Sequence, residues 1–169
     1  FLSKNFDIKK IKFKIFKGNI LNEFEDVKKN DGSPFKVFTP FWRNAEKIYL
    51  EKIPPKYKKI SKCVKKTSFF KDTIAEKDID PKKKWFKKFE QHWTPGEENA
   101  LNELKKFVKE KIENYSDSRN FPSIIGTSKL SPFIKHGQIH VETIWDECNR
   151  NRKNGVGKFI AEIGWREFN

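Results

Sequence analysis

Residues 94–112, TPGEENALNELKKFVKEKI, carry the clearest structural signal in the chain. Thr94 and Glu97 have the spacing of a capping box, and Pro95 suits the first turn of a helix, where a missing N–H does no harm. The stretch predicts an amphipathic helix that continues to Tyr115. Its apolar face consists of Ala100, Leu101, Leu104, Phe107, Val108 and Ile112.

The sequence after this helix predicts more helices. Ser131 followed by Pro132 begins a short helix, and Gly137 ends it. Two further helical patterns cover residues 139–149 and 156–168. The C-terminal half of the chain is therefore predicted to be entirely helical.

The sequence before these helices has a mixed character. Alternating apolar and basic residues within 8–16 predict a half-buried strand. After a turn cluster at 30–34, Thr39 as the cap and Pro40 as the first residue predict an amphipathic helix. Lysines crowd residues 54–92 with little periodicity, which indicates a linker; an arm that binds nucleic acid is the alternative.

The composition excludes several classes of protein. A chain of 169 residues with 15% aromatic residues can form a hydrophobic core and is unlike a disordered basic tail. The net charge is +14, yet only five of the 37 basic residues are arginine. The lysines are explained either by a solvated surface or by a face that binds phosphate. No apolar run has the length of a membrane span, and no secretion signal opens the sequence.

Cysteine and histidine also carry little signal. Two cysteines cannot form a disulfide framework, so we expect a protein of the reducing cytoplasm without membrane attachment. His92, His136 and His140 lack the spacing of metal ligands, and we predict no metal site. The chain contains no methionine and begins at Phe1, so we expect it to be an internal piece of a longer protein.

The loop at 126–131, GTSKLS, contains small hydroxylated residues and a lysine beside a glycine. Backbone N–H groups and hydroxyls in such a loop can approach an anion closely. The spacing of a Walker loop is absent. A turn followed by a helix cap explains the same residues, so the pattern alone leaves both interpretations open.

The last predicted helix separates two sets of side chains. Val156, Ile160 and Ile163 form its apolar face, and Glu162, Trp165 and Arg166 lie on a different arc. One interpretation is a surface ion pair between Glu162 and Arg166 beside an ordinary tryptophan. The other is a wall on which a carboxylate, an indole and a guanidinium face one ligand, such as a nucleotide.

Four groups of motifs, in their order and spacing, resemble the DNA photolyase/cryptochrome family, and most of all a class I cyclobutane pyrimidine dimer photolyase. The resemblance extends from about residue 11 to the end of the chain. The motifs are VFTPFWR at 37–43, WTPGE at 93–97, the run Tyr115, Arg119-Asn120-Phe121-Pro122, GTSKLSP at 126–132 and Gly137-Gln138-Ile139, and EIGWREF at 162–168.

The resemblance implies an architecture and an activity. Residues 1–52 would be the C-terminal part of an α/β, Rossmann-like antenna domain, 53–92 an interdomain linker, and 93–169 the N-terminal part of an all-helical FAD-binding domain. Such enzymes use light to excite reduced FAD, which donates an electron that splits a pyrimidine dimer flipped out of DNA. A cryptochrome-type blue-light photoreceptor is the alternative on the same fold. A basic nucleic-acid-binding module without flavin explains the lysines but not the motif order.

The resemblance also assigns roles to single residues. Glu162 and Trp165 match the carboxylate and indole that contact the dimer in catalysis. The positions that match DNA-contacting residues of the family are Arg119, Glu162, Trp165, Arg166 and Asn169. The FAD-binding positions are Tyr115, Thr127, Ser128, Lys129, Leu130, Ser131 and Phe159.

Two positions depart from the family pattern. His136 stands where an aromatic or apolar residue is common, and Phe159 stands where tryptophan is frequent. Neither change removes a required chemical group. The expected cofactors are reduced FAD and a second antenna chromophore, for which methenyltetrahydrofolate is the candidate. The expected partner is DNA that contains pyrimidine dimers, bound by a monomer with no protein partner.

Overall fold

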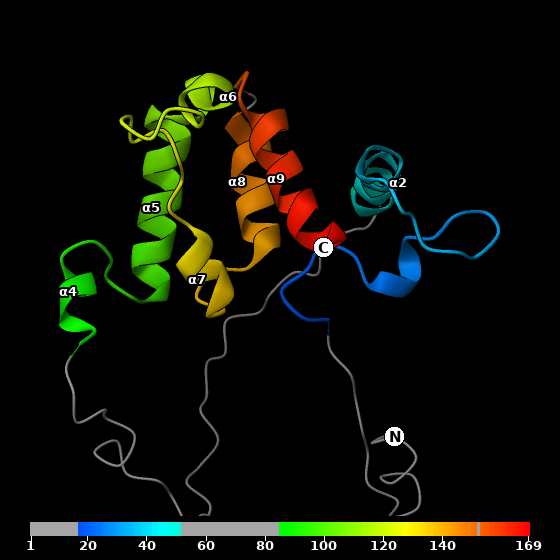
Figure 1. The fold of residues 1–169 in the computed structure, drawn as a ribbon, viewed down its shortest axis with the longest axis horizontal. Helices are drawn as coiled ribbons and strands as arrows, with labels where there is room; N and C mark the ends of the chain where they lie inside the picture. The colour runs from blue at the N-terminus through cyan, green and yellow to red at the C-terminus, as the bar shows by residue number, and fades with distance from the viewer. Residues whose placement is uncertain (1–16, 52–84, 152) are drawn as a thin grey trace, which may run out of the picture. The chain divides into compact units, whose positions relative to one another are not determined.

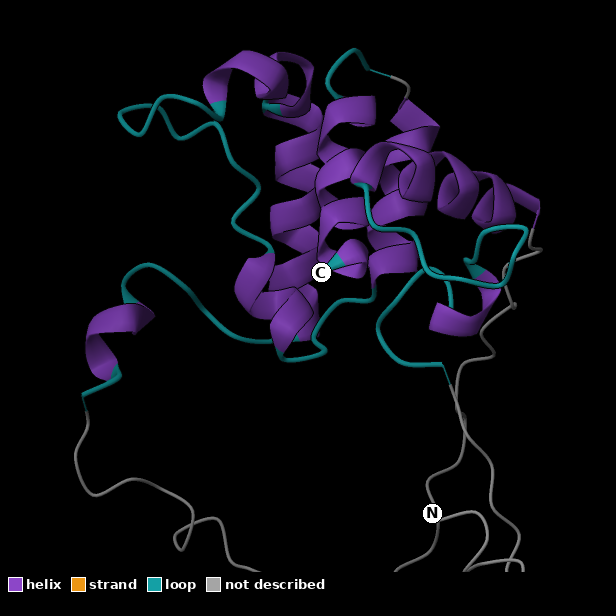
Figure 2. Cartoon of the chain, turned by 45° about the vertical axis from the view of Figure 1, so that its right-hand side comes forward, coloured by secondary structure: helices purple, strands orange, loops and turns teal. Residues whose placement is uncertain are grey.

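The computed structural model describes residues 17–51, 85–151 and 153–169, which are coloured in Figure 1. The chain divides into two compact units, one of Phe1–Lys52 with Pro95–Asn169 and the other of Ile53–Thr94. Within the described residues all regular structure is helical (Figure 2), and the strand predicted at 8–16 lies outside them.

The first unit contains most of the helices. In chain order they are η1 (Phe24–Asp26), α2 (Phe38–Glu51), α5 (Glu97–Glu110), η2 (Ile112–Asn114), α6 (Tyr115–Ser118), α7 (Ser131–Lys135), α8 (Val141–Asn151) and α9 (Val156–Phe168). The described part of the second unit contains α4 (Lys87–Glu90), which falls in the stretch predicted as a linker.

The core of the first unit lies between α5, α8 and α9, which run side by side in Figure 1. Helix α8 contacts both α5 and α9, and α2 packs on α9 from the side away from α5. Each helix presents an apolar face at helical spacing, so burial of these faces against one another drives the packing. The fully buried side chains include Leu104, Phe107, Val108, Ile112, Leu130, Phe133, Val141 and Ile144.

The segment at 17–22 is tied to the helices by polar bonds. The Asn19 side chain donates to the carbonyls of Ile134 and Ile139 at 3.0 and 3.1 Å and accepts the Val141 N–H at 2.9 Å. At the other end, the partly buried Glu167 carboxyl accepts the backbone N–H groups of Leu21 and Asn22. The segment thus connects the α7–α8 turn with the end of α9.

The capping box predicted at Thr94 is wrong. Helix α5 begins at Glu97, three residues later, with Gly96 at its N-cap and no side chain as the cap. Gly96 has φ +126°, a conformation that favours glycine, and its N–H donates to the Gln138 side chain at 3.1 Å. The turn is therefore set by a glycine and a distant amide. The long helix is also shorter than predicted, since it ends at Glu110 and is followed by the short helices η2 and α6.

The other boundaries are close to the predicted ones. Helix α9 has the predicted bounds, and α7 begins at Ser131 with proline in its first turn and Gly137 after its end. Helix α8 covers Val141–Asn151, two residues later than predicted. Thr39 does not cap α2, because the helix already begins at Phe38 and the Val37 carbonyl accepts the first helical bond, from the Phe41 N–H.

Candidate functional site

One cluster of predicted site residues forms where α6 contacts α9. The Arg119 guanidinium, directly after α6, donates a hydrogen bond to the Glu162 carboxylate on α9. The same guanidinium lies over the Tyr115 ring, with 5.6 Å between Cζ and the ring centroid. The structure therefore brings the Glu162 carboxylate, which is distant in the sequence, to a cation and a phenol that lie one turn apart.

The electrostatics of this cluster are defined by burial and by the ion pair. Burial raises the pKa of the Tyr115 phenol, and the hydrogen bond to Glu162 raises the pKa of the Arg119 guanidinium. The tyrosine is thus neutral and the arginine charged at neutral pH. The exposed fractions of the Arg119 and Glu162 side chains are 27% and 30%, so an external ligand can reach both.

Phe159 lies beneath this cluster and belongs to the core. Its ring is 4.6 Å from that of Phe107 and 5.2 Å from that of Tyr115, between ring centroids, and 4% of the residue is exposed. It supports Tyr115 from below. Its direct contact with a cofactor, which the family resemblance implies, stays a prediction.

Trp165 lies one turn after Glu162 on α9 and is partly exposed. Its indole stacks on the Phe38 ring of α2, with 3.8 Å between ring centroids and 9° between ring planes. Phe168 packs edge-on against both rings, at 5.8 and 5.9 Å. Because 41% of Trp165 remains exposed, the indole has one covered face and one accessible side.

The surface ion pair between Glu162 and Arg166 is not formed within the described residues. Glu162 bonds to Arg119, and Arg166 donates to the Asn19 carbonyl at 2.8 Å. Asn169 is exposed and its N–H donates to the Trp165 carbonyl. Glu162 and Arg166 therefore have separate partners, and the wall on which Glu162, Trp165 and Arg166 face one ligand stays a prediction.

The loop at 126–131 packs against α6 through its glycine. A side chain on Gly126 would meet the Ser118 hydroxyl at 2.5 Å, so the close approach requires glycine there. Lys129 has φ 55°, an uncommon left-handed conformation, and the Ser128 hydroxyl accepts the Leu130 N–H at 3.3 Å. Leu130 is buried, and the exposed members of the loop are Thr127, Lys129 and Ser131. Hydroxyls and an ammonium group of this kind can hold a phosphate.

Comparison with known proteins shows that the chain is similar to DNA photolyases. The family model for DNA photolyase matches residues 2–59. Deoxyribodipyrimidine photo-lyases from Agrobacterium fabrum and Alkalihalophilus pseudofirmus are 32% and 33% identical over 90% and 94% of this chain. The crystal structure of a bacterial class III photolyase from Agrobacterium tumefaciens superposes with a TM-score of 0.73 at 29% identity, over 99% of this chain and 36% of that one.

The chain belongs to the DNA photolyase/cryptochrome family. It spans about one third of the length of the curated relatives it matches, since it covers 33% of each of the two bacterial enzymes. Cryptochrome-1 of Arabidopsis thaliana is also similar, at 26% identity over 90% of this chain. The solved photolyase belongs to class III, so the resemblance to class I stays a prediction.

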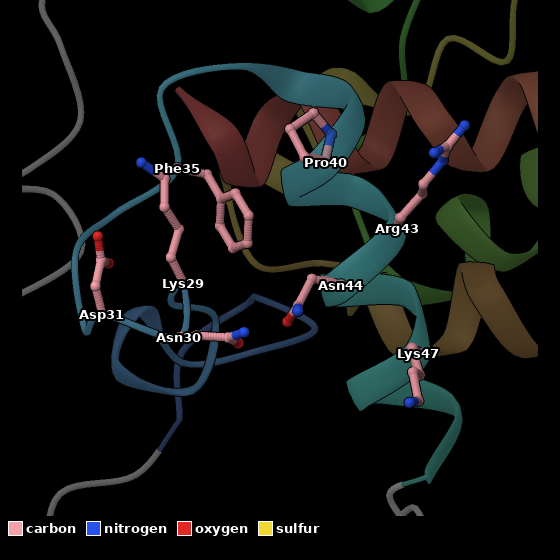
Figure 3. Close-up of a pocket in the computed structure, with 8 residues that line it drawn as sticks. All are labelled: Lys29, Asn30, Asp31, Phe35, Pro40, Arg43, Asn44 and Lys47. Carbon is pink, nitrogen blue, oxygen red and sulfur yellow. The ribbon is translucent and has the colours of Figure 1, made fainter.

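Among the described residues of this photolyase-family chain is a depression that the sequence did not predict. Figure 3 shows it between the turn at 29–35 and the outward face of α2, with a volume of about 630 Å³. Asp31 in its wall accepts hydrogen bonds from the Ser33 N–H and hydroxyl, which lower the pKa of the Asp31 carboxyl. Lys29, Arg43 and Lys47 also line the depression. Because these three cations outnumber the one carboxylate, the charge of the depression favours an anion as ligand. The lining residues are Lys29, Asn30, Asp31, Phe35, Pro40, Arg43, Asn44 and Lys47.

A signal for this depression was present in the sequence. Arg43 and Lys47 lie one helical turn apart, and like charges at that spacing repel each other on a helix. None of the residues assigned by family resemblance lines the depression.

The described residues offer neither a metal site nor a membrane span. They contain no group of three or more His, Cys, Asp or Glu side chains that could hold a metal ion. No described helix is long and apolar enough to cross a membrane.

Proposed function

We propose that this chain is part of an enzyme that repairs cyclobutane pyrimidine dimers in DNA by light-driven electron transfer from excited reduced FAD. The observation that carries the proposal is the placement of Glu162 and Trp165 on adjacent turns of α9. Glu162 is bonded to Arg119 and still reachable, and Trp165 offers one accessible side of its indole. The names of the two bacterial relatives support the same activity.

The chemistry of these groups suits a nucleotide taken out of a DNA duplex. The indole of Trp165 can stack on a pyrimidine ring, and the Glu162 carboxylate can accept a hydrogen bond from a pyrimidine N–H. The Arg119 guanidinium uses one donor on Glu162, and its remaining donors can bind a phosphate oxygen. Arg166 and Asn169, exposed at the end of α9, are assigned to the DNA backbone on the family resemblance.

The loop at 126–131 fits the phosphate part of FAD. Thr127, Lys129 and Ser131 are exposed and offer two hydroxyls and an ammonium group, and the left-handed Lys129 turns the backbone there. Ser128 and Leu130 hold the loop in shape, and Tyr115 lies near its anchor on α6. When bound, reduced FAD supplies the electron that opens the cyclobutane ring. A second antenna chromophore, with methenyltetrahydrofolate as the candidate, is proposed on the family resemblance.

The proposal includes the domain organisation and the setting. Residues 1–52 would form the end of an α/β antenna domain, 53–92 the linker and 93–169 the start of the helical FAD-binding domain. We place the enzyme in the cytoplasm as a monomer of class I, which acts on damaged DNA without a protein partner.

The test is light-dependent loss of thymine dimers with the full-length, flavin-loaded protein and its Glu162→Ala variant. Removal of this carboxylate should lower the repair rate at subsaturating DNA more than tenfold, because an unpaired base N–H and an unpaired Arg119 are left in the site. The flavin content should stay within about twofold of the wild type, since Glu162 is assigned to DNA. Glu113→Ala is the control, because Glu113 is an exposed carboxylate outside the cluster.

Two results would contradict parts of this proposal. Wild-type protein that binds flavin and removes no dimers under light would favour the cryptochrome-type photoreceptor. Loss of flavin from Glu162→Ala, with repair per bound flavin unchanged, would move Glu162 from the DNA site to the cofactor site.

A further inference from the structure

We infer that Phe38 is a positioning residue that backs the Trp165 indole, so that the indole receives a base on one side only. The inference rests on the proposed function of Trp165 and adds a residue that no part of the family resemblance assigns to the site. Phe38 belongs to α2, whereas Glu162 and Trp165 belong to α9.

The first observation is the geometry of the two rings. Their centroids are 3.8 Å apart and their planes differ by 9°, so the phenyl ring covers one face of the indole almost in parallel. Phe168 closes an edge of the same pair at interplanar angles of 79° to Trp165 and 74° to Phe38. An exposed tryptophan without such support would sample several rotamers. Here it is held against an aromatic surface.

The second observation is the way in which α2 is held on α9. Gly164, directly before Trp165, meets the Trp42 ring so closely that a Cβ there would lie 2.3 Å from Trp42 Cε3. Trp42 in turn packs edge-on against Trp145 of α8 at 6.1 Å, and its plane lies within 7° of that of Phe38. Phe38 therefore sits on a helix whose position is fixed by tryptophan packing one turn away.

Together these contacts determine what the indole can do. A base that stacks on Trp165 must approach from the side opposite Phe38, which is the accessible side. A ring already held in place loses little freedom when the base binds, and that preorganisation strengthens binding. The backing ring should therefore affect recognition of a flipped base more than binding to undamaged duplex, which uses phosphate contacts.

The experiment compares Phe38→Ala, Phe38→Tyr and Phe41→Ala in the full-length, flavin-loaded protein. Phe41 belongs to the same helix and contacts Phe168 and Phe35 but makes no ring contact with Trp165. Phe38→Ala should reduce the ratio of affinities for dimer-containing over undamaged DNA by about two- to tenfold. Phe38→Tyr should restore the ratio, and Phe41→Ala should leave it unchanged although it removes a ring of the same size. Equal ratios for Phe38→Ala and Phe41→Ala would overturn the inference.

A second measurement separates this inference from the proposed function. With 5-fluorotryptophan incorporated, the ¹⁹F signal of Trp165, assigned by its loss in Trp165→Phe, should shift and broaden in Phe38→Ala but not in Phe41→Ala. Absence of dimer preference in the wild type would refute the proposed function, whatever the ¹⁹F spectra show. An unchanged Trp165 signal in Phe38→Ala would refute the positioning role even in an active enzyme.

Discussion

The contact between Gly164 and Trp42 provides a direct test of how α2 is seated on α9. Replacement of Gly164 by alanine would place a Cβ 2.3 Å from Trp42 Cε3 and 2.6 Å from Cζ3. Carbon atoms of this kind do not approach closer than 3.0 Å, so the indole or one of the helices must move by at least 0.7 Å. Because Trp42 also contacts Phe38 and Trp145, such a movement disturbs a packed cluster.

The size of the effect follows from two opposing contributions. Alanine is favoured over glycine inside a helix by about 1 kcal/mol. Overpacking of a well-filled interior costs about 1–3 kcal/mol. Gly157→Ala is the matched control, since Gly157 lies in the same helix with nothing within 4 Å of the new Cβ. The control should gain stability, and Gly164→Ala should have a free energy of unfolding about 1–3 kcal/mol below that of the control.

The assay is urea-induced unfolding of both variants, followed by far-ultraviolet circular dichroism. Near-ultraviolet dichroism serves as a second readout, because displacement of Trp42 changes the aromatic stack between Phe38 and Trp165. A Gly164→Ala variant that is as stable as Gly157→Ala, with an unchanged near-ultraviolet spectrum, would refute the close approach of α2 to α9.

Three further predictions concern other parts of the chain. Burial raises the pKa of the Glu167 carboxyl above its ordinary value of 4.5. The contribution of this carboxyl to stability is therefore complete below pH 4.5 and is lost as the pH rises through the folded-state pKa. Thermal unfolding from pH 4 to 7 should show this loss in the wild type and not in Glu167→Gln. Burial also raises the pKa of the Cys148 thiol to about 12, so iodoacetamide at pH 8 should modify it only after denaturation, in a Cys63→Ser background. Gly96→Ala should destabilise the protein by about 1 kcal/mol or more, measured as a lower urea midpoint, because φ +126° is strained for alanine.

Local periodicity was sufficient for the helices that bury one strong apolar face. Helix α9 has the predicted bounds because Val156, Ile160 and Ile163 recur at helical spacing and all three are buried. The start of α5 was wrong because the sequence shows the Thr94–Glu97 spacing but not the left-handed Gly96 or its bond to Gln138. A cap supplied from a distant loop leaves no periodic signal.

The partner of Glu162 was hidden for a similar reason. Sequence spacing offered Arg166 one turn away, whereas the structure pairs Glu162 with Arg119 and leaves Arg166 on the Asn19 carbonyl. The pairing depends on α6 lying across α9, which is a tertiary contact. The family resemblance assigned both Arg119 and Glu162 to DNA contacts, but it did not predict that the two side chains pair with each other.

The aromatic layer between α2 and α9 bears on how the sequence motifs work together. The sequence shows two separate motifs, VFTPFWR at 37–43 and EIGWREF at 162–168. In the structure Phe38 of the first motif stacks on Trp165 of the second, and Trp42 of the first lies against Gly164 of the second. Because the two segments share one packed surface, a substitution in either is transmitted to the indole that faces outward. In the proposed repair enzyme, the first motif can therefore influence lesion recognition without touching DNA. The contribution of the motif at 37–43 to lesion recognition should be measured as a change in the orientation of Trp165. This contribution does not require the motif to contact DNA.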